Sequence, residues 1–225
     1  VADQILNRKK NWAMKELFDK TSFRTSKLTT QLYSTSFSMG TRFLSPTIQE
    51  AIYGIYGFVR FADEIVDTFH DFDKARLLNK FKDDTYEAIQ DGISLNPILN
   101  SFQHVVRKYD IDHSLIDTFL ESMEMDLNKS TYSRQGYEKY ILGSAEVVGL
   151  MCLKVFVYGD QKKYQELEYS AMRLGAAFQK INFLRDLKAD FEEMGRSYFP
   201  GADLTHFNDE EKRKIEKEIE VDFAE

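Results

Sequence analysis

The sequence contains almost no cysteine and little proline or glycine. Its 225 residues include 1 Cys, 3 Pro and 11 Gly. A single cysteine, Cys152, excludes an internal disulfide and indicates a reducing compartment, the cytoplasm. Because Cys152 lies in an apolar run, we expect a buried, inert thiol rather than a nucleophile. The shortage of helix breakers favours long helices.

An excess of positive charge and a long uncharged apolar run are also missing. The 30 Lys and Arg residues stand against 37 Asp and Glu, and the net charge of −7 disfavours a nucleic-acid binder. The most apolar stretch, residues 141–159, contains Glu146 and Lys154, so we predict a buried core helix rather than a membrane span. The polar N-terminus shows no signal-peptide pattern. Since the chain begins with Val1 and ends in a charged run, we expect a piece of a longer protein.

Large aromatic side chains, in contrast, are abundant. There are 18 Phe and 12 Tyr. Apolar residues recur at helical spacing, and no stretch alternates as a strand would. We therefore predict an all-α fold in a single domain over residues 1–225, with helices over 46–68, 135–158 and 161–194. The charged tail from Asn208 onward is predicted to be an exposed helix.

A first polar row lies within an otherwise apolar helix. Tyr56, Arg60, Asp63 and Asp67 are spaced 4, 3 and 4 residues apart, so they share one helix face. Such a row is usually a solvated face, but here most of the remaining circumference is apolar. A helix that is apolar nearly all round is buried, and its charges need partners.

A second row repeats this pattern. Gln179, Asn182, Asp186 and Asp190 are spaced 3, 4 and 4 residues apart, again among Phe, Ile and Leu. If the two rows faced each other without neutralisation, each pair of like charges would cost on the order of 4 kcal/mol at 4 Å and an effective dielectric near 20. Divalent cations remove that cost, and oxygen ligands without His or Cys select a hard ion such as Mg²⁺.

These rows and four further segments resemble the squalene/phytoene synthase family of head-to-head prenyl transferases, most closely the bacterial phytoene synthases. The resemblance covers about residues 33–200. Its segments, in order, are YSTSF (33–37), RFLSP (42–46), YGFVRFADEIVD (56–67), YILGSAEVVG (140–149), QKINFLRDLKAD (179–190) and GRSYFP (195–200).

The resemblance implies an isoprenoid-synthase-type helical bundle around a central cavity. The implied ligands of Mg²⁺, or of Mn²⁺, are Asp63, Glu64, Asp67, Asn182, Asp186 and Asp190. The implied substrate contacts are Ser34, Ser36, Phe37, Arg60, Gln179, Asn182, Arg196 and Tyr198. The implied catalytic residues are Tyr56, Arg60, Asp63, Tyr140 and Asp186. Asp190 and Tyr198 are one residue further apart than in the commonest family pattern, and family chains continue past residue 225 with helices that close the bundle.

Several of these residues also have a purely structural interpretation. Ser34 and Ser36 are equally suited to cap a helix. Tyr140 is compatible with an ordinary core tyrosine whose hydroxyl has a partner. Gly143 and Gly149 either allow close helix packing or leave room for a polyprenyl tail.

The implied reaction joins two geranylgeranyl diphosphates into phytoene through a cyclopropylcarbinyl diphosphate. The alternative is a squalene or dehydrosqualene synthase that acts on two farnesyl diphosphates, with NADPH as reductant for squalene. A different class, a non-catalytic helical assembly protein that retains the fold, is expected to have lost the motif aspartates, and all four are present. The expected partners are polyprenyl diphosphates, with peripheral contact to the cytoplasmic face of a membrane for release of the apolar product.

Overall fold

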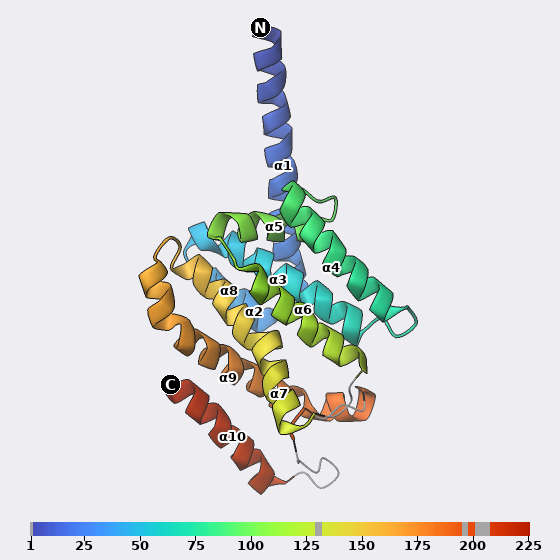
Figure 1. Cartoon of the computed structure of the whole chain (residues 1–225), viewed down its shortest axis with the longest axis vertical. Coiled ribbons are helices and arrows are strands. Elements are labelled where there is room, and N and C mark those ends of the chain that lie inside the picture. Colours follow the sequence, from blue (N-terminus) through green and yellow to red (C-terminus); the bar gives the residue numbers. More distant parts are fainter. Residues whose placement is uncertain (1, 129–131, 195–197, 201–207) are drawn as a thin grey trace. The chain divides into compact units, whose positions relative to one another are not determined.

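Every regular element that the structure describes is a helix. A computed structural model describes residues 2–128, 132–194, 198–200 and 208–225, the side chains of residues 2–13, 128 and 188–194 excepted. These ranges contain no strand, which confirms the predicted all-α class. The helices (Figure 1) are α1 (Ala2–Tyr33), α2 (Thr35–Arg42), α3 (Pro46–Asp67), α4 (Lys74–Asp91), α5 (Pro97–Tyr109), α6 (His113–Asn128), α7 (Arg134–Ile141), the π-helix η1 (Leu142–Glu146), α8 (Val147–Phe156), α9 (Gln161–Met194) and α10 (Asp209–Ala224).

The chain forms two compact units. Unit 1 comprises Val1–Glu64 and Asn79–Asp110, and unit 2 comprises Ile65–Leu78 and Ile111–Glu225. Helix α3 contributes its first 19 residues to unit 1 and its last three to unit 2. The single domain expected over residues 1–225 stays a prediction.

Unit 1 is built around helix α3, which begins at Pro46 as predicted because proline fits the first turn of a helix. Its core includes Phe58, which is fully buried. The Phe58 ring stacks on Phe102 of α5 with 3.9 Å between ring centroids, and on Phe81 of α4 at 5.5 Å. This packing buries the apolar sides of α3 and leaves the polar row half-buried.

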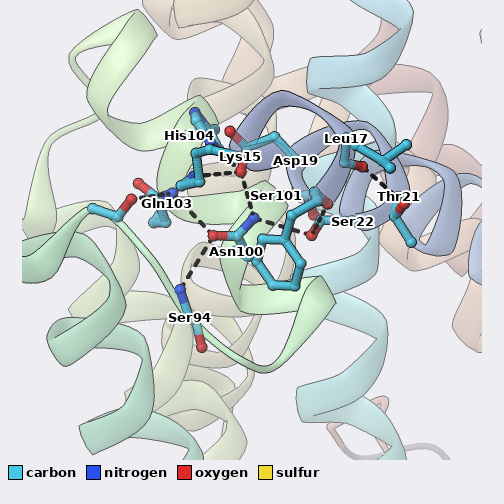
Figure 2. Close-up of polar contacts among 12 residues, drawn as sticks. Lys15, Leu17, Asp19, Thr21, Ser22, Ser94, Asn100, Ser101, Gln103 and His104 are labelled. Atoms are coloured by element: carbon cyan, nitrogen blue, oxygen red, sulfur yellow. Dashed lines mark hydrogen bonds and ion pairs between the residues drawn. The ribbon is translucent and has the colours of Figure 1, made fainter. Parts of the chain in front are cut away.

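Helices α1 and α5 of unit 1 are joined by a buried polar network that the sequence did not predict (Figure 2). Asn100 on α5 donates to Asp19 Oδ1 and to Ser22 Oγ of α1, both at 3.0 Å. One turn further along α1, Ser26 and Ser101 share a hydrogen bond of 2.6 Å. Ser22 and Ser26 of α1 are therefore buried against α5 instead of facing water.

Unit 2 contains a helix that is divided where the sequence predicted an unbroken one over residues 135–158. The path runs through α7, the π-helix η1 and α8. A π-turn holds one extra residue per turn, and periodicity does not reveal it.

Three glycines allow close helix packing in unit 2. A Cβ added at Gly143 would lie 2.5 Å from Ser122 Cβ of α6, and one at Gly149 would lie 2.7 Å from the Ala171 carbonyl oxygen of α9. A Cβ at Gly175 would lie 2.7 Å from the Ala145 carbonyl oxygen of η1. Close packing is therefore the interpretation of Gly143 and Gly149 that the structure supports.

The prediction of an exposed C-terminal helix is partly wrong. Helix α10 forms and is capped by Asn208, whose side chain accepts from the Glu210 and Glu211 backbone amides. However, α10 packs against α9 and buries Ile215 and Ile219. These apolar residues are four positions apart, so a narrow apolar face is enough to dock a helix that is otherwise charged.

The charges in the apolar stretch 141–159 are paired within unit 2. Glu146 accepts a hydrogen bond from Arg173 of α9, and Lys154 lies 3.0 Å from Asp112. No helix in the described part of the chain is long and apolar enough to cross a membrane. The core helix predicted for this stretch is confirmed.

Candidate active site

The polar face of α3 in unit 1 is organised around Arg60. Its guanidinium donates to Glu64 Oε2 at 2.5 Å and stacks on the Tyr33 ring at 4.6 Å from the centroid. Both members of the ion pair are largely buried, with 27% and 15% of their side chains exposed. Burial by itself would lower the pKa of Arg60, but the bond to Glu64 and the nearby Asp63 carboxylate outweigh it and raise the pKa. Arg60 is thus a permanent, fixed cation.

Residues of α2 complete this cluster. The Phe37 ring stacks on Tyr56 with 4.7 Å between centroids. The Ser34 hydroxyl accepts from the Phe37 backbone amide at 3.2 Å and caps α2, and it also bonds the Tyr56 side chain. Burial raises the pKa of Tyr56, so its phenol stays protonated at neutral pH. The capping interpretation of Ser34 is therefore confirmed, and its contact to diphosphate stays a prediction.

Arg60 retains a donor for a further ligand. Its Nε atom is buried and has no hydrogen-bond partner. Buried polar groups are nearly always paired, and an unpaired N–H of a guanidinium suits a phosphate oxygen. The predicted substrate contact Ser36 lies on α2, the short helix that Ser34 caps, and it is exposed.

The first set of acidic residues lies on α3. Asp63, Glu64 and Asp67 are all half-buried, and Asp63 and Asp67 are one helical turn apart. Asp63 and Glu64 belong to unit 1, whereas Asp67 belongs to unit 2.

The second set lies on α9 in unit 2. Gln179 and Asn182 are half-buried, and the Asn182 amide is 3.5 Å from the Gln179 side-chain oxygen. Asp186 is 44% exposed and forms two hydrogen bonds with its neighbour Arg185, at 2.6 and 2.8 Å. The side chain of Asp190 and all of Arg196 lie outside the described residues. Since Asp63 and Asp186 are in different units, the confrontation of the two rows stays a prediction.

Helix α9 is less buried than its sequence predicts. Phe178 is 54% exposed and Ile181 is 37% exposed, whereas Phe183 is 5% exposed. The expectation of a helix apolar and buried nearly all round is therefore wrong for α9. Apolar side chains on a helix surface are common, and composition alone does not separate them from core positions.

Tyr140 and Tyr198 meet in an aromatic cluster of unit 2. The Tyr198 ring stacks on Phe183 of α9 with 4.1 Å between centroids, and it lies 5.3 Å from Tyr140. The buried carboxylate of Asp126 on α6 accepts hydrogen bonds from Tyr140 at 2.6 Å and from Tyr132 at 2.7 Å. The hydroxyl of Tyr140 thus has a partner, as its structural interpretation required.

The donor chemistry of the acidic residues suits a hard cation. Carboxylate and amide oxygens are the donors on α3 and α9, and Mg²⁺ prefers these ligands. Among the side chains that the structure describes, no three His, Cys, Asp or Glu residues are gathered as a metal-binding group. Mg²⁺ is usually bound by one or two carboxylates together with substrate phosphates, and the α3 carboxylates next to Arg60 fit that mode.

Comparison with known proteins identifies the family. The squalene/phytoene synthase family model matches residues 30–222. The chain is 29% identical over 179 residues to phytoene synthase 1, chloroplastic, of Solanum lycopersicum, and 31% identical over 186 residues to phytoene synthase, chloroplastic, of Daucus carota. Each match covers 76% of this chain. The chain belongs to the squalene/phytoene synthase family.

Solved structures show that this family member has the expected fold. A dehydrosqualene synthase in complex with ligand superposes with a TM-score of 0.79 at 21% identity, covering 92% of this chain and 76% of the other. Squalene synthase HpnC from Alicyclobacillus acidocaldarius gives 0.75 at 21% identity, with 92% and 82% covered. The isoprenoid-synthase-type helical fold is thereby confirmed. The chain spans only 42% and 44% of the length of the two phytoene synthases.

Two residues that contact predicted site residues, Tyr33 and Asp126, were not themselves predicted from the sequence. Tyr33 opens the YSTSF segment, but nothing in the sequence links it to Arg60, which its ring contacts. Asp126 precedes Tyr140 by 14 residues, with a loop between α6 and α7. The one available signal for Asp126 is an acidic residue between apolar neighbours, Met125 and Leu127.

Proposed function

We propose that the protein condenses two allylic polyprenyl diphosphates head to head in a Mg²⁺-dependent reaction. The supporting observation is the Arg60 cluster of unit 1. It combines a fixed cation, an unpaired buried N–H at Arg60 Nε, a hydroxyl at Ser34 and carboxylates at Asp63 and Glu64. Anion, metal and hydroxyl contacts of this kind suit a diphosphate leaving group.

In this proposal Arg60 binds a diphosphate and stabilises the negative charge that grows on it as the allylic C–O bond breaks. Asp63, Glu64 and Asp67 on α3 would hold Mg²⁺, and so would Asn182, Asp186 and Asp190 on α9. When bound, Mg²⁺ neutralises diphosphate charge and so favours its departure. Glu64 also pairs with Arg60, and this contact orients the guanidinium.

The aromatic residues act on the carbocation that the departing diphosphate leaves behind. Loss of diphosphate from one substrate leaves an allylic cation, which the double bond of the second substrate attacks. Loss of a proton from the resulting cation closes the three-membered ring and gives a cyclopropylcarbinyl diphosphate. Departure of the second diphosphate, rearrangement and loss of one proton then give the coupled hydrocarbon. The rings of Tyr56, Tyr140 and Tyr198 stabilise positive charge and exclude water. Gln179 and Phe37 complete the substrate contacts.

We assign two geranylgeranyl diphosphates as substrates and phytoene as product, supported by the resemblance of the chain to phytoene synthases. The second candidate is squalene or dehydrosqualene formation from farnesyl diphosphate, because the structures that superpose with this chain include such enzymes. In both cases the apolar product leaves through peripheral contact with a membrane.

Incubation of the full-length protein with each diphosphate tests this proposal. We expect phytoene from geranylgeranyl diphosphate with Mg²⁺ and none after chelation with EDTA. Squalene that appears only with farnesyl diphosphate and NADPH would replace the phytoene assignment by the second candidate. The double variant Asp63→Asn with Asp186→Asn is expected to lose turnover and keep its helical circular-dichroism spectrum.

Arg60→Lys is a sharper probe of the cluster, because lysine keeps the charge but loses the planar set of donors. We expect at least a tenfold loss of kcat/KM. Lys108→Arg, on helix α5 of unit 1, is the matched control, and it should leave turnover unchanged. Full activity of Arg60→Lys would contradict the role of its guanidinium, and binding of the diphosphate by the wild type without any coupled product would indicate a binding protein.

A further inference from the structure

The Asp126 carboxylate is a buried charge inside an aromatic cluster. It is 6% exposed and lies on α6, and each of its oxygens accepts one tyrosine hydroxyl. Tyr132 donates to Oδ1 at 2.7 Å and Tyr140 donates to Oδ2 at 2.6 Å. Hydrogen bonds to a carboxylate are shorter and stronger than bonds between neutral groups. The two hydroxyl protons are therefore fixed in direction.

The rings around Tyr140 restrict it further. Its centroid lies 5.2 Å from Tyr132, 5.3 Å from Tyr198 and 5.9 Å from Phe183. Tyr140 is 5% exposed, so its ring has little freedom to turn. Tyr140 also lies two residues before Leu142, where the π-helix η1 begins. Single π-turns inside helices are frequent at functional sites.

We infer that Asp126 is a positioning residue for the coupling reaction, acting through the Tyr140 hydroxyl; this inference rests on the proposed function. By accepting the hydrogen bond of the Tyr140 hydroxyl, the carboxylate directs the lone pairs of the Tyr140 oxygen away from α6. A phenol that donates to a carboxylate also gains electron density on its oxygen and ring. Such a ring attracts a nearby cation more strongly than an unassisted tyrosine does. Asp126 itself touches neither substrate nor metal in this inference.

A purely structural role for Asp126 makes different predictions. Ion and hydrogen-bond pairing alone would make Asp126 important for folding and leave the chemical step unchanged once the protein is folded. A positioning role through Tyr140 makes the effects of the two residues on kcat depend on each other, because removal of either one breaks the same connection.

Tyr137 offers a matched control within the same cluster. It is 1% exposed, and its buried hydroxyl has no hydrogen-bond partner. Tyr137→Phe removes one oxygen from a buried tyrosine, as Tyr140→Phe does, but breaks no bond to a carboxylate. Tyr132→Phe removes the other bond to Asp126 and leaves Tyr140 bonded.

The test is a double-mutant cycle on kcat with the full-length protein, Mg²⁺ and geranylgeranyl diphosphate. We expect Asp126→Asn and Tyr140→Phe each to lower kcat at least tenfold with KM within twofold of wild type. The double variant should match the single ones, whereas Tyr137→Phe should keep wild-type kcat. Circular dichroism at 222 nm establishes that each variant is folded. If Asp126→Asn does not fold, Asp126→Glu takes its place in the same cycle, since it keeps the acceptor but displaces it by one methylene.

The outcomes separate this inference from the proposed function. Wild-type kcat in the folded Asp126 variant, or losses that multiply in the double variant, would overturn the inference while the active wild type upholds the proposed function. Wild-type protein that couples neither geranylgeranyl nor farnesyl diphosphate would refute the proposed function and this inference with it.

Discussion

Gly175 on α9 allows the close approach of α9 to η1, and its replacement by alanine tests that packing. A Cβ at this position would lie 2.7 Å from the Ala145 carbonyl oxygen, 3.1 Å from the Ala145 carbonyl carbon and 3.3 Å from Glu146 Cα. All three are backbone atoms, so no side-chain rotation relieves the contact. The shortest distance is about 0.7 Å below the 3.4 Å at which ordinary van der Waals contact begins.

The expected change is the difference between two effects. Overpacking a well-packed interior costs about 1–3 kcal/mol. Alanine in place of glycine inside a helix returns about 1 kcal/mol through backbone entropy. We therefore expect Gly175→Ala to lower the free energy of unfolding by about 1 kcal/mol.

Gly136 on α7 provides the control in the same unit. The nearest atom to a Cβ there is Ser133 Oγ at 3.4 Å, an ordinary contact. The same substitution, Gly136→Ala, should therefore raise the free energy of unfolding by about 0.5 kcal/mol. Urea denaturation followed by circular dichroism at 222 nm measures both. Gly175→Ala as stable as Gly136→Ala would refute the argument that backbone contact determines the sign.

Three further predictions concern unit 2. Asp222→Asn should lower the free energy of unfolding by about 3 kcal/mol, because the buried Lys180 loses the carboxylate at 2.6 Å and keeps only Glu218 at 3.8 Å; unchanged hydrogen exchange in α10 would contradict this. Cys152 is half-buried, and burial raises its pKa to about 12, so the native thiol should react with a thiol reagent at pH 8 far more slowly than the urea-unfolded chain, and equal rates would contradict this. Burial also raises the pKa of Glu146 above its ordinary value of 4.5, although Arg173 opposes the shift. The Glu146 carboxyl group therefore binds its proton more tightly in the folded state than in the unfolded chain. As the pH falls through its raised pKa, protonation of Glu146 should raise the free energy of unfolding. Glu146→Gln should therefore gain less free energy of unfolding than the wild type between pH 7 and pH 5; equal gains would show that Glu146 does not contribute.

The long helices were predictable from sequence because their signals are local. Pro46 and the apolar spacing after it place the start of α3, and α9 has the predicted bounds of 161–194. The π-helix η1 was not predictable, because the packing of Gly143 and Gly175 against neighbouring helices is a tertiary effect. The docking of α10 was missed because Ile215 and Ile219 are outnumbered by charged neighbours.

Some residues of the candidate site were predicted from the sequence, but their contacts with other helices were not. Segment resemblance named Ser34, Tyr56 and Arg60, and the structure brings these three together in unit 1. It did not supply their partners. Tyr33 and Asp126 act through contacts across helices, and such contacts leave no periodic trace in a single sequence.

The hydrogen bonds between α1 and α5 fix the register of the two helices along their axes. Asp19, Ser22 and Ser26 of α1 are hydrogen-bonded to Asn100 and Ser101 of α5, so sliding α1 by one turn would break all three of these bonds. The far end of the same helix carries the tyrosine that stacks on Arg60. A network a few turns away thus fixes the position of the Tyr33 ring along the axis of α1, and a substitution such as Asn100→Leu should displace the ring that contacts Arg60.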